Sequence, residues 1–344
     1  MESARILIEG IGGVGGVIAG KLIQAGCSPT LVTGNREISE AINQRGLTVI
    51  EPGKKATLPT RAFSSLAELP AEARFDMALL VMKAHSVAQT ASDTLPFLKP
   101  QNGFVVTFQN GITEDAVAAA IGNKRVIAGI VGWGATLHGP GVVERTGPGM
   151  LHIGELDGSM TERLENLART LKAVTPVVTT DNIRGGQWSK LAINCTITTI
   201  GALTGESLGR MLKDARVRRA FLGIYREVVD TALALGMRLE RIAVDPMMLY
   251  VPPDAGYLTL FLKDLLVRLA GLKHGKLKSS SLQSLERGRK TEIDFLNGYV
   301  AEQARKVGVP APLNETITRM IKEIEQGKRK LSPANMEELL ATTV

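Results

Sequence analysis

Residues 6–22, "ILIEGIGGVGGVIAGKL", combine three patterns that together indicate the class of fold. The segment starts as a short apolar run typical of a buried strand, continues as a glycine-rich loop, and ends with the periodicity of a helix. The loop places Gly10, Gly12 and Gly15 in the spacing G-x-G-x-x-G. In a nucleotide-binding loop the first glycine makes the tight turn and the second lets the backbone approach a pyrophosphate. The third allows the helix to pack closely on the strand.

A helix that starts directly after such a loop offers free N–H groups and a partial positive charge to phosphates. We therefore predict that this loop binds a dinucleotide. The alternative is a glycine-rich turn without a ligand. The residues expected to contact the dinucleotide are Gly10, Ile11, Gly12, Gly13, Val14 and Gly15.

The end of the second predicted strand, residues 29–34, distinguishes NAD from NADP. A carboxylate at this point would bind the ribose 2′-hydroxyl of NAD, whereas a positively charged group accommodates the 2′-phosphate of NADP. The chain has Asn35 and Arg36 here, and no acidic residue before Glu37. This pattern favours NADP as the cofactor. The alternative is that Arg36 only begins a solvated helix.

The pattern of the chain changes once, near Asp181. Before it, β-branched runs alternate with helical segments, which predicts an α/β domain with a mostly parallel sheet. Within this part, residues 141–155 have the alternation and the Gly-Pro-Gly break of an antiparallel hairpin. We therefore expect a Rossmann-type dinucleotide-binding domain over residues 1–181 and an all-α domain over residues 182–344. In the second domain, helices are expected over 186–200, 207–236, 258–272, 280–307 and 312–326.

The composition is that of a globular protein, since 44% of the 344 residues are hydrophobic and 22% are charged. No apolar run reaches the ~18 residues that a membrane span requires, and "MESARILIEG" lacks the pattern of a signal peptide. With only two cysteines, these features predict a cytoplasmic protein that does not bind membranes.

The net charge of +7 is combined with only 4% aromatic residues, which does not match a surface that binds single-stranded nucleic acid. A moderately basic chain suits small anionic ligands such as phosphates and carboxylates, so no nucleic-acid partner is expected. The sequence leaves the oligomeric state open, a homodimer being one option. No metal site is predicted, because ligand spacing is absent among the four histidines, His85, His138, His152 and His274.

A second candidate site lies in residues 185–205, "GGQWSKLAINCTITTIGALTG". Lys190, Asn194 and Thr198 follow one another at intervals of four, so they share one face of a helix, and they would share one face of a strand as well. A desolvated lysine has a lowered pKa, which suits it to donate a proton near neutral pH. The alternative is that Lys190 extends its ammonium group to solvent or pairs with an acid.

Five motifs in this order resemble the ketopantoate reductase (2-dehydropantoate 2-reductase) family over essentially the whole chain. They are the glycine loop, "VMKAH" (81–85), "FQNGI" (108–112), "WSKLAINC" (188–195) and "TEIDFLNG" (291–298). The resemblance implies an NADP-binding Rossmann domain followed by a helical domain that binds the substrate and performs catalysis. It also implies NADPH-dependent reduction of 2-dehydropantoate to pantoate, a step of pantothenate biosynthesis.

The resemblance further implies roles for individual residues. Lys190 matches the catalytic lysine that polarises and protonates the ketone oxygen while hydride reaches the adjacent carbon. Asn194 and Ser280 match residues that bind the substrate. Glu292 matches a glutamate near the lysine and the nicotinamide, which makes it both a catalytic and a cofactor-binding candidate.

Lys83 and Asn110 match positions that contact the cofactor at the ends of two Rossmann strands. Each of these family positions also has a simpler interpretation. Lys83 and Asn110 are typical of helix starts and turns, and Ser280 is a suitable helix cap. Glu292 is a suitable partner for a neighbouring basic residue.

The chain departs from the family pattern at two positions. Thr198 stands where the family often has a second asparagine, and a hydroxyl replaces an amide that offers both a donor and an acceptor. The family's arginine for the 2′-phosphate falls on Asn35, with Arg36 next to it. We place Thr198 in the substrate site, and the change leaves two enzyme hypotheses: reduction of 2-dehydropantoate, or of a different 2-oxo acid, for instance a larger or more apolar one. A third hypothesis, a non-catalytic dinucleotide-binding sensor, does not explain why Lys190, Asn194 and Glu292 are all present.

Overall fold

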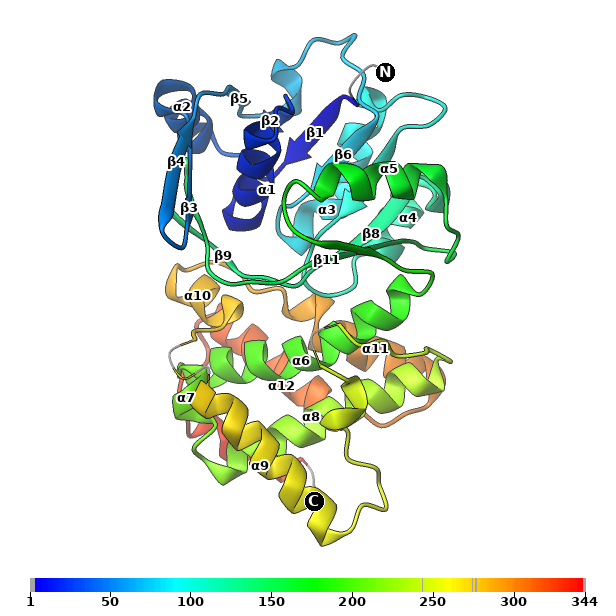
Figure 1. Ribbon diagram of the computed structural model, residues 1–344. Coiled ribbons are helices and arrows are strands. Elements are labelled where there is room, and N and C mark those ends of the chain that lie inside the picture. Colours follow the sequence, from blue (N-terminus) through cyan, green and yellow to red (C-terminus); the bar gives the residue numbers. More distant parts are fainter. Residues whose placement is uncertain (1–3, 243, 274, 276, 343–344) are drawn as a thin grey trace. The chain divides into compact units, whose positions relative to one another are not determined.

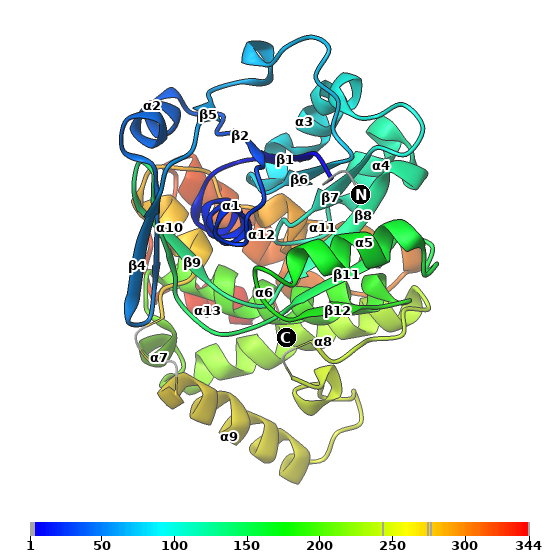
Figure 2. The same cartoon turned by 45° about the horizontal axis from the view of Figure 1, so that its top comes forward.

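The computed structural model describes residues 4–242, 244–273, 275 and 277–342. The chain forms two compact units, and Figures 1 and 2 follow it through them. The first unit contains Met1–Gln109 and Thr113–Ile183, and the second contains Asn110–Ile112 and Arg184–Val344. The structure therefore changes unit at Ile183, two residues beyond the expected position. It also assigns three residues of the "FQNGI" motif to the helical unit.

The first unit is built on an eight-stranded sheet with the order β12-β11-β8-β7-β6-β1-β2-β5. From β5 to β8 all neighbours are parallel. Starting from β1, the chain adds β2 and β5 toward one edge of the sheet and then β6, β7 and β8 toward the other. This change of direction between β1 and β6 is typical of the doubly wound dinucleotide-binding fold. β11 runs antiparallel to β8, and β12 pairs in parallel with β11. The strands are β1 (Ile6–Glu9), β2 (Thr30–Val32), β5 (Ala62–Phe63), β6 (Met77–Leu80), β7 (Phe104–Thr107), β8 (Val126–Val131), β11 (Leu151–Glu155) and β12 (Val177–Thr179).

Both faces of this sheet are covered. Ile6 and Ile8 of β1 pack in one apolar cluster with α1 and α5, whereas Leu7 packs in another with α3 and α4. A strand buried on both sides needs apolar residues at every position, which explains the continuous apolar runs in the sequence. The helices of this unit are α1 (Gly13–Gln24), α2 (Arg36–Arg45), α3 (Val87–Thr94), α4 (Glu114–Ile121) and α5 (Glu162–Leu171), with 3₁₀ turns η1 (Leu66–Glu68), η2 (Ala84–Ser86), η3 (Leu95–Phe97) and η4 (Asn123–Arg125).

A second, four-stranded sheet has the order β4-β3-β10-β9. The prediction of a hairpin over residues 141–155 is wrong, because β10 pairs with β9 and β3 while β11 lies in the large sheet. The tight turn is at Gly141, with φ 77°, so the hairpin joins β9 to β10. The later Gly-Pro-Gly segment leads from one sheet to the other, and the Arg145 guanidinium holds it through the carbonyls of Gly147 and Gly149. The strands are β3 (Leu47–Glu51), β4 (Lys54–Leu58), β9 (Ala135–Gly139) and β10 (Val142–Arg145).

The second unit is helical, as predicted, but two of the expected helices are divided. The segment 207–236 is interrupted before Asp214, whose carboxylate caps a new helix by accepting a hydrogen bond from Arg216 N at 2.8 Å. The segment 280–307 is interrupted at Gly288, which has φ 64°. The elements are α6 (Ile183–Thr204), α7 (Leu208–Met211), α8 (Ala215–Ala234), η5 (Pro246–Met248), α9 (Tyr257–Lys273), α10 (Ser280–Glu286), η6 (Ile293–Phe295), α11 (Asn297–Val307), α12 (Pro312–Glu325) and α13 (Asn335–Ala341).

None of the helices in the described ranges combines the length and the hydropathy that crossing a membrane requires.

Candidate functional site

The three glycines of the loop have three different environments. Gly10 has φ +92°, and a Cβ added there would lie 2.5 Å from Met82 N. A Cβ on Gly15 would lie 2.1 Å from the Gly10 carbonyl oxygen. A Cβ on Gly12 would have no atom within 4 Å. The first and third glycines therefore permit packing inside the protein, whereas the second faces open space that a ligand can approach.

The start of α1 suits an anionic group. Gly12 is the N-cap residue and supplies no side chain, and the first turn contains no acidic residue. The N–H groups of the first turn lack partners within the helix, so a phosphate can accept them. Backbone donors, an open approach at Gly12 and the absence of negative charge fit a dinucleotide pyrophosphate. Ile11 is buried beneath the loop, whereas Gly13 and Val14 belong to the first turn.

Asn35 and Arg36 lie at the start of α2, directly after β2. The Asn35 side chain caps the helix by accepting a hydrogen bond from Ile38 N at 3.1 Å. Arg36 is exposed and pairs with Glu40 one turn later, with Nε 2.8 Å from Oε1. The hydrogen bond to Glu40 raises the pKa of Arg36. Arg36 does begin a solvated helix, as the alternative interpretation stated, and binding a 2′-phosphate would require it to exchange its carboxylate partner.

Lys83 follows β6 and is exposed, and its backbone caps the short helix η2. Gln109, which was not predicted as a site residue, is the buried residue that connects the ends of β6 and β7. Its Nε2 donates to the carbonyls of Leu80 and Met82 at 2.8 and 3.1 Å. An amide at the end of an apolar strand was the only signal in the sequence. This bond fixes the backbone that leads into Lys83.

Asn110 is partly buried and belongs to the helical unit. The next two residues hold it there. A Cβ on Gly111, which has φ +87°, would lie 2.1 Å from the Phe295 carbonyl oxygen, and the amide of Ile112 donates to the same oxygen at 3.4 Å. Ile112 is buried in the helical core. Asn110 is therefore fixed close to η6, the short helix for which Glu292 is the N-cap residue.

Lys190, Asn194 and Thr198 lie on one face of α6, and the segment is helical rather than extended. Hydroxyl groups on the other faces donate to carbonyls of the preceding turn, for example Ser189 to Gly185 at 2.9 Å. Such bonds satisfy polar groups inside a buried helix and explain how so many threonines are accommodated. Lys190 and Asn194 are partly buried, as are two isoleucines on the same side of the helix, Ile193 and Ile197.

A buried chain of amides holds the turn of α6 that carries Asn194. Asn297 Nδ2 donates to the carbonyl of Cys195 at 3.0 Å and to Asn314 Oδ1 at 2.9 Å. Asn314 in turn donates to Glu227 at 2.7 Å. Burial raises the pKa of Glu227, and the N–H groups at the start of α12 oppose this shift. Asn297 is part of the "TEIDFLNG" motif, but its role in supporting α6 could not be read from the sequence.

The start of α10 lies against the turn of α6 that contains Thr198. Ser279 caps α10 by accepting a hydrogen bond from Leu282 N at 3.2 Å, and its hydroxyl donates to the carbonyl of Thr198 at 2.9 Å. The capping role considered for Ser280 therefore belongs to Ser279. Ser280 is the first residue of α10 and is partly buried. Its hydroxyl makes no hydrogen bond to the described part of the chain.

Glu292 is buried at the start of η6. The preceding Thr291 is fixed to α12, because its amide and its hydroxyl both donate to Glu325 Oε1, at 2.6 and 2.7 Å. The same hydroxyl accepts a hydrogen bond from Ile293 N at 3.2 Å. Glu292 is therefore held in a rigid turn of the helical unit, the unit that also carries Lys190.

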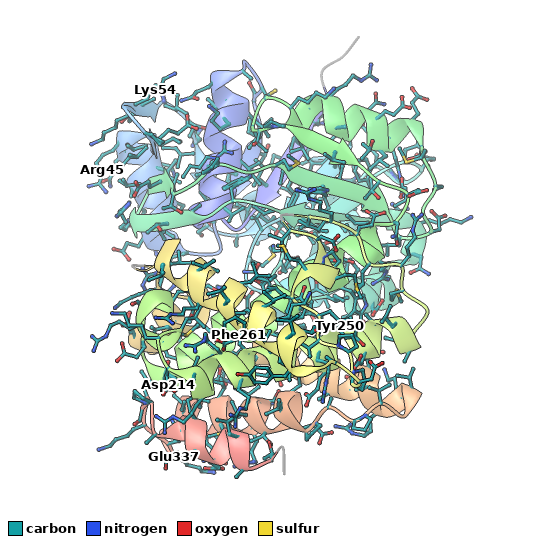
Figure 3. The ribbon with its side chains drawn as sticks, turned by 60° about the horizontal axis from the view of Figure 1, so that its bottom comes forward. Arg45, Lys54, Asp214, Tyr250, Phe261 and Glu337 are labelled. Carbon is teal, nitrogen blue, oxygen red and sulfur yellow. The ribbon has the colours of Figure 1, made fainter. Side chains whose placement is uncertain are left out.

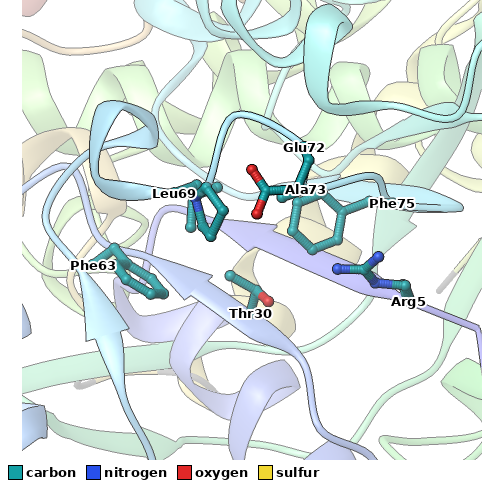
Figure 4. Close-up of a pocket in the computed structure, with 8 residues that line it drawn as sticks. Arg5, Thr30, Phe63, Leu69, Glu72, Ala73 and Phe75 are labelled. Carbon is teal, nitrogen blue, oxygen red and sulfur yellow. The ribbon is translucent and has the colours of Figure 1, made fainter.

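A hollow of about 210 Å³ lies elsewhere in the first unit (Figure 4). Arg5, which precedes β1, and Thr30, which begins β2, are among its lining residues. These residues lie at the amino ends of parallel strands, whereas the glycine loop follows the carboxyl end of β1. The hollow is therefore at the opposite edge of the sheet from the expected cofactor site.

Within the described ranges, no group of three His, Cys, Asp or Glu side chains is arranged to hold a metal ion. His274 lies outside these ranges.

Comparison with known proteins finds two family models in this chain. The model described as "Ketopantoate reductase PanE/ApbA" matches residues 6–158, and its C-terminal counterpart matches residues 182–325. Two proteins named 2-dehydropantoate 2-reductase, from Mesorhizobium japonicum and Pyrococcus horikoshii, are each 30% identical to it. Each comparison covers 93% of this chain and 97% of the relative.

Solved structures have the same fold. A PanE/ApbA family ketopantoate reductase from Ralstonia eutropha JMP134 is 27% identical, with a TM-score of 0.79 over 95% of this chain and all of the other. D-mandelate dehydrogenase, in a ternary structure with NADH and anilino(oxo)acetate, has a TM-score of 0.81 at 21% identity over 94% of this chain and 99% of the other. The predicted fold and the predicted family are therefore confirmed: the chain belongs to the ketopantoate reductase PanE/ApbA family.

Proposed function

We propose that this protein is an NADPH-dependent reductase that converts 2-dehydropantoate to pantoate, a step of pantothenate biosynthesis. The observation that carries the proposal is the arrangement on α6, where Lys190 and Asn194 share one partly buried face. The same unit holds Asn110 and Glu292. Relatives that match this chain over nearly their whole length are named for this reaction.

A nicotinamide dinucleotide, when bound, supplies the hydride. The backbone of the glycine loop, residues 10–15, would hold its pyrophosphate, and Lys83 and Asn110 would contact it from the ends of β6 and β7. NADP is favoured because the end of β2 has no carboxylate for a ribose 2′-hydroxyl. Arg36 directly follows Asn35, the position of the family's arginine. It would bind the 2′-phosphate in exchange for its present partner, Glu40.

Lys190 would act as the general acid. Its ammonium group polarises the ketone oxygen and transfers a proton to it, so that the product carries a hydroxyl group at that carbon. The amide of Asn194, one turn further, both donates and accepts hydrogen bonds and would orient the substrate. Glu292 would help to position Lys190 and the nicotinamide end of the cofactor, and Ser280 would offer its hydroxyl to the substrate.

A second candidate function follows from the composition of the same face. Thr198 replaces a larger amide, and Ile193 and Ile197 add partly exposed apolar surface beside Lys190 and Asn194. These side chains favour a substrate with an apolar group next to the 2-oxo acid. The alternative activity is therefore NADPH-dependent reduction of a different, larger or more apolar 2-oxo acid.

One experiment separates these hypotheses. The loss of NADPH absorbance is measured with 2-dehydropantoate and with a panel of 2-oxo acids of increasing side-chain size, and the series is repeated with NADH. Fastest turnover of 2-dehydropantoate with NADPH supports the first proposal, and fastest turnover of a larger acid supports the second. If no acid is reduced with either cofactor, the reductase proposal is wrong and a dinucleotide-binding sensor becomes the better hypothesis.

The cytoplasmic location and the absence of nucleic-acid and membrane partners remain part of this proposal.

A further inference from the structure

Helix α9 turns two of its charged residues, Lys263 and Asp264, toward its own unit. Lys263 Nζ donates to the carbonyls of Met247 and Met248, at 3.1 and 2.6 Å. Asp264 pairs with the buried guanidinium of Arg218 at 2.7 Å. Val267, between these charges on the same side, is fully buried. Lys263, Asp264 and Val267 therefore attach this side of α9 to its own unit, whereas Leu260, one heptad before Val267, is 43% exposed.

The outward face of α9 is a row of leucines that we call the leucine seam. Its members follow one another at intervals of four, three, four and three residues, the heptad spacing that keeps one side of a helix against a partner helix. At about 100° per residue the seam lies opposite Val267. Its side chains are between 39% and 69% exposed. The leucine seam consists of Leu258, Leu262, Leu265, Leu269 and Leu272.

The seam extends into a larger apolar surface, because Tyr257, Phe261 and Leu266 beside it are also exposed. At roughly 200 Å² for a fully exposed large apolar side chain, these eight residues present on the order of 900 Å². The largest apolar patch of a typical monomer is roughly 300–600 Å², and each partner of a standard dimer buries about 800 Å². In Figures 1 and 2, α9 lies at the periphery of the helical unit, and Figure 3 shows this side with Phe261 labelled. The area matches what a stable dimer needs.

We propose that the leucine seam is the interface through which two copies of this chain associate, with their α9 helices packed antiparallel about a two-fold axis at Leu265. A second copy fits because it presents the same heptad row, and a two-fold interface uses the same surface twice. The seam extends seven residues to either side of Leu265, so Leu258 of one copy meets Leu272 of the other. The antiparallel direction also brings Arg268 of one copy beside Phe261 of the other, where a guanidinium and an aromatic face attract.

Sedimentation of the full-length protein tests the interface. The wild type is expected to sediment at micromolar concentration with twice the monomer mass of 36.8 kDa. The double variant Leu262→Glu/Leu265→Glu is expected to sediment as the monomer, because paired carboxylates cannot be buried in the seam. Leu233→Glu on α8 is the matched control, since Leu233 is as exposed as Leu262 but lies outside the seam; it should remain dimeric. A monomeric wild type, or a double variant that stays dimeric, overturns the proposal.

Cysteine pairing tests the direction of the helices. Leu265→Cys should form a disulfide with itself under mild oxidation, because its two copies meet on the axis. Leu258→Cys should remain unpaired alone and should pair when mixed with Leu272→Cys. Efficient self-pairing of Leu258→Cys would show a parallel arrangement and overturn the antiparallel model. A monomeric wild type that co-sediments with anionic phospholipid vesicles would assign the seam to a lipid surface instead.

Discussion

Single methyl groups added to the glycine loop should separate cofactor binding from folding. Gly12→Ala and Gly15→Ala are the same chemical change three residues apart, but the structure gives them opposite consequences. The methyl group at Gly12 enters open space, whereas the one at Gly15 is directed at the Gly10 carbonyl oxygen. We expect Gly12→Ala to lose the dinucleotide and Gly15→Ala to lose stability.

The magnitudes follow from the two environments. At Gly12, a methyl group would keep the pyrophosphate from the N–H groups of α1, and a hydrogen bond to a charged group contributes about 1.5–3 kcal/mol. At about 1.4 kcal/mol per factor of ten, NADPH affinity should fall by roughly 10- to 100-fold. At Gly15 the added atom lies only 2.1 Å from a backbone oxygen, so the loop must move. Overpacking of this kind costs about 1–3 kcal/mol or more, which lowers Tm by several degrees.

Titration calorimetry with NADPH and thermal unfolding without ligand measure the two effects. We expect opposite results for the two variants: weak binding and normal Tm for Gly12→Ala, and lowered Tm for Gly15→Ala. Gly26→Ala, at the end of α1, is unsuitable as a control, because its φ of +84° would add strain of its own. Gly139→Ala is suitable, since no atom lies within 4 Å of its Cβ position and it is remote in sequence from the loop. Wild-type affinity in Gly12→Ala would refute the assignment of the pyrophosphate to this loop.

Three further predictions concern single residues. Lys190→Ala should lower kcat by roughly 10²- to 10⁴-fold, the usual contribution of a general acid, and an unchanged kcat would show that another group donates the proton. Thr198→Asn, which restores the family's amide, should raise kcat/KM for 2-dehydropantoate relative to larger 2-oxo acids; a lower ratio contradicts the role of Thr198 in substrate choice. Burial raises the pKa of Glu9 to about 7 from 4.5, so the folded state takes up a proton that the unfolded state releases. Stability should therefore fall by about 3 kcal/mol as pH rises from about 4.5 through about 7, and Glu9→Gln should remove this dependence in urea unfolding at several pH values.

Local patterns in the sequence were sufficient to predict the class of fold. Three features indicated it: the glycine loop, the continuous apolar strands and the change to helical periodicity. Each depends only on residues that are close in sequence, so each can be read directly from the sequence. The prediction of a hairpin at residues 141–155 was wrong because turn signals alone do not show which strands pair. Gly141 and the later Gly-Pro-Gly segment are both turn signals, and only the strands on either side of each turn show which one closes a hairpin.

The hydrogen bonds that hold the candidate site in place could not be predicted, because they join residues far apart in the chain. Ser279 and Ser280 are adjacent and chemically identical, and only the carbonyl of Thr198, more than eighty residues away in sequence, distinguishes the helix cap from its neighbour. Asn297 reaches Cys195 across a similar separation. The face of Lys190 and Asn194 could be predicted from spacing, whereas the groups that hold this face in place could not.

The placement of Asn110–Ile112 has a consequence for dissecting the protein. Because these three residues leave the first unit and return to it, the polypeptide passes between the units at Gln109, at Ile112 and at Ile183. A fragment ending at Ile183 would carry Ile112 without the core that buries it. A fragment starting at Arg184 would lack the backbone that fills the space beside Phe295. Neither half is therefore a natural unit for expression, and exchanging domains with a relative would require the three-residue segment to be exchanged together with the helices.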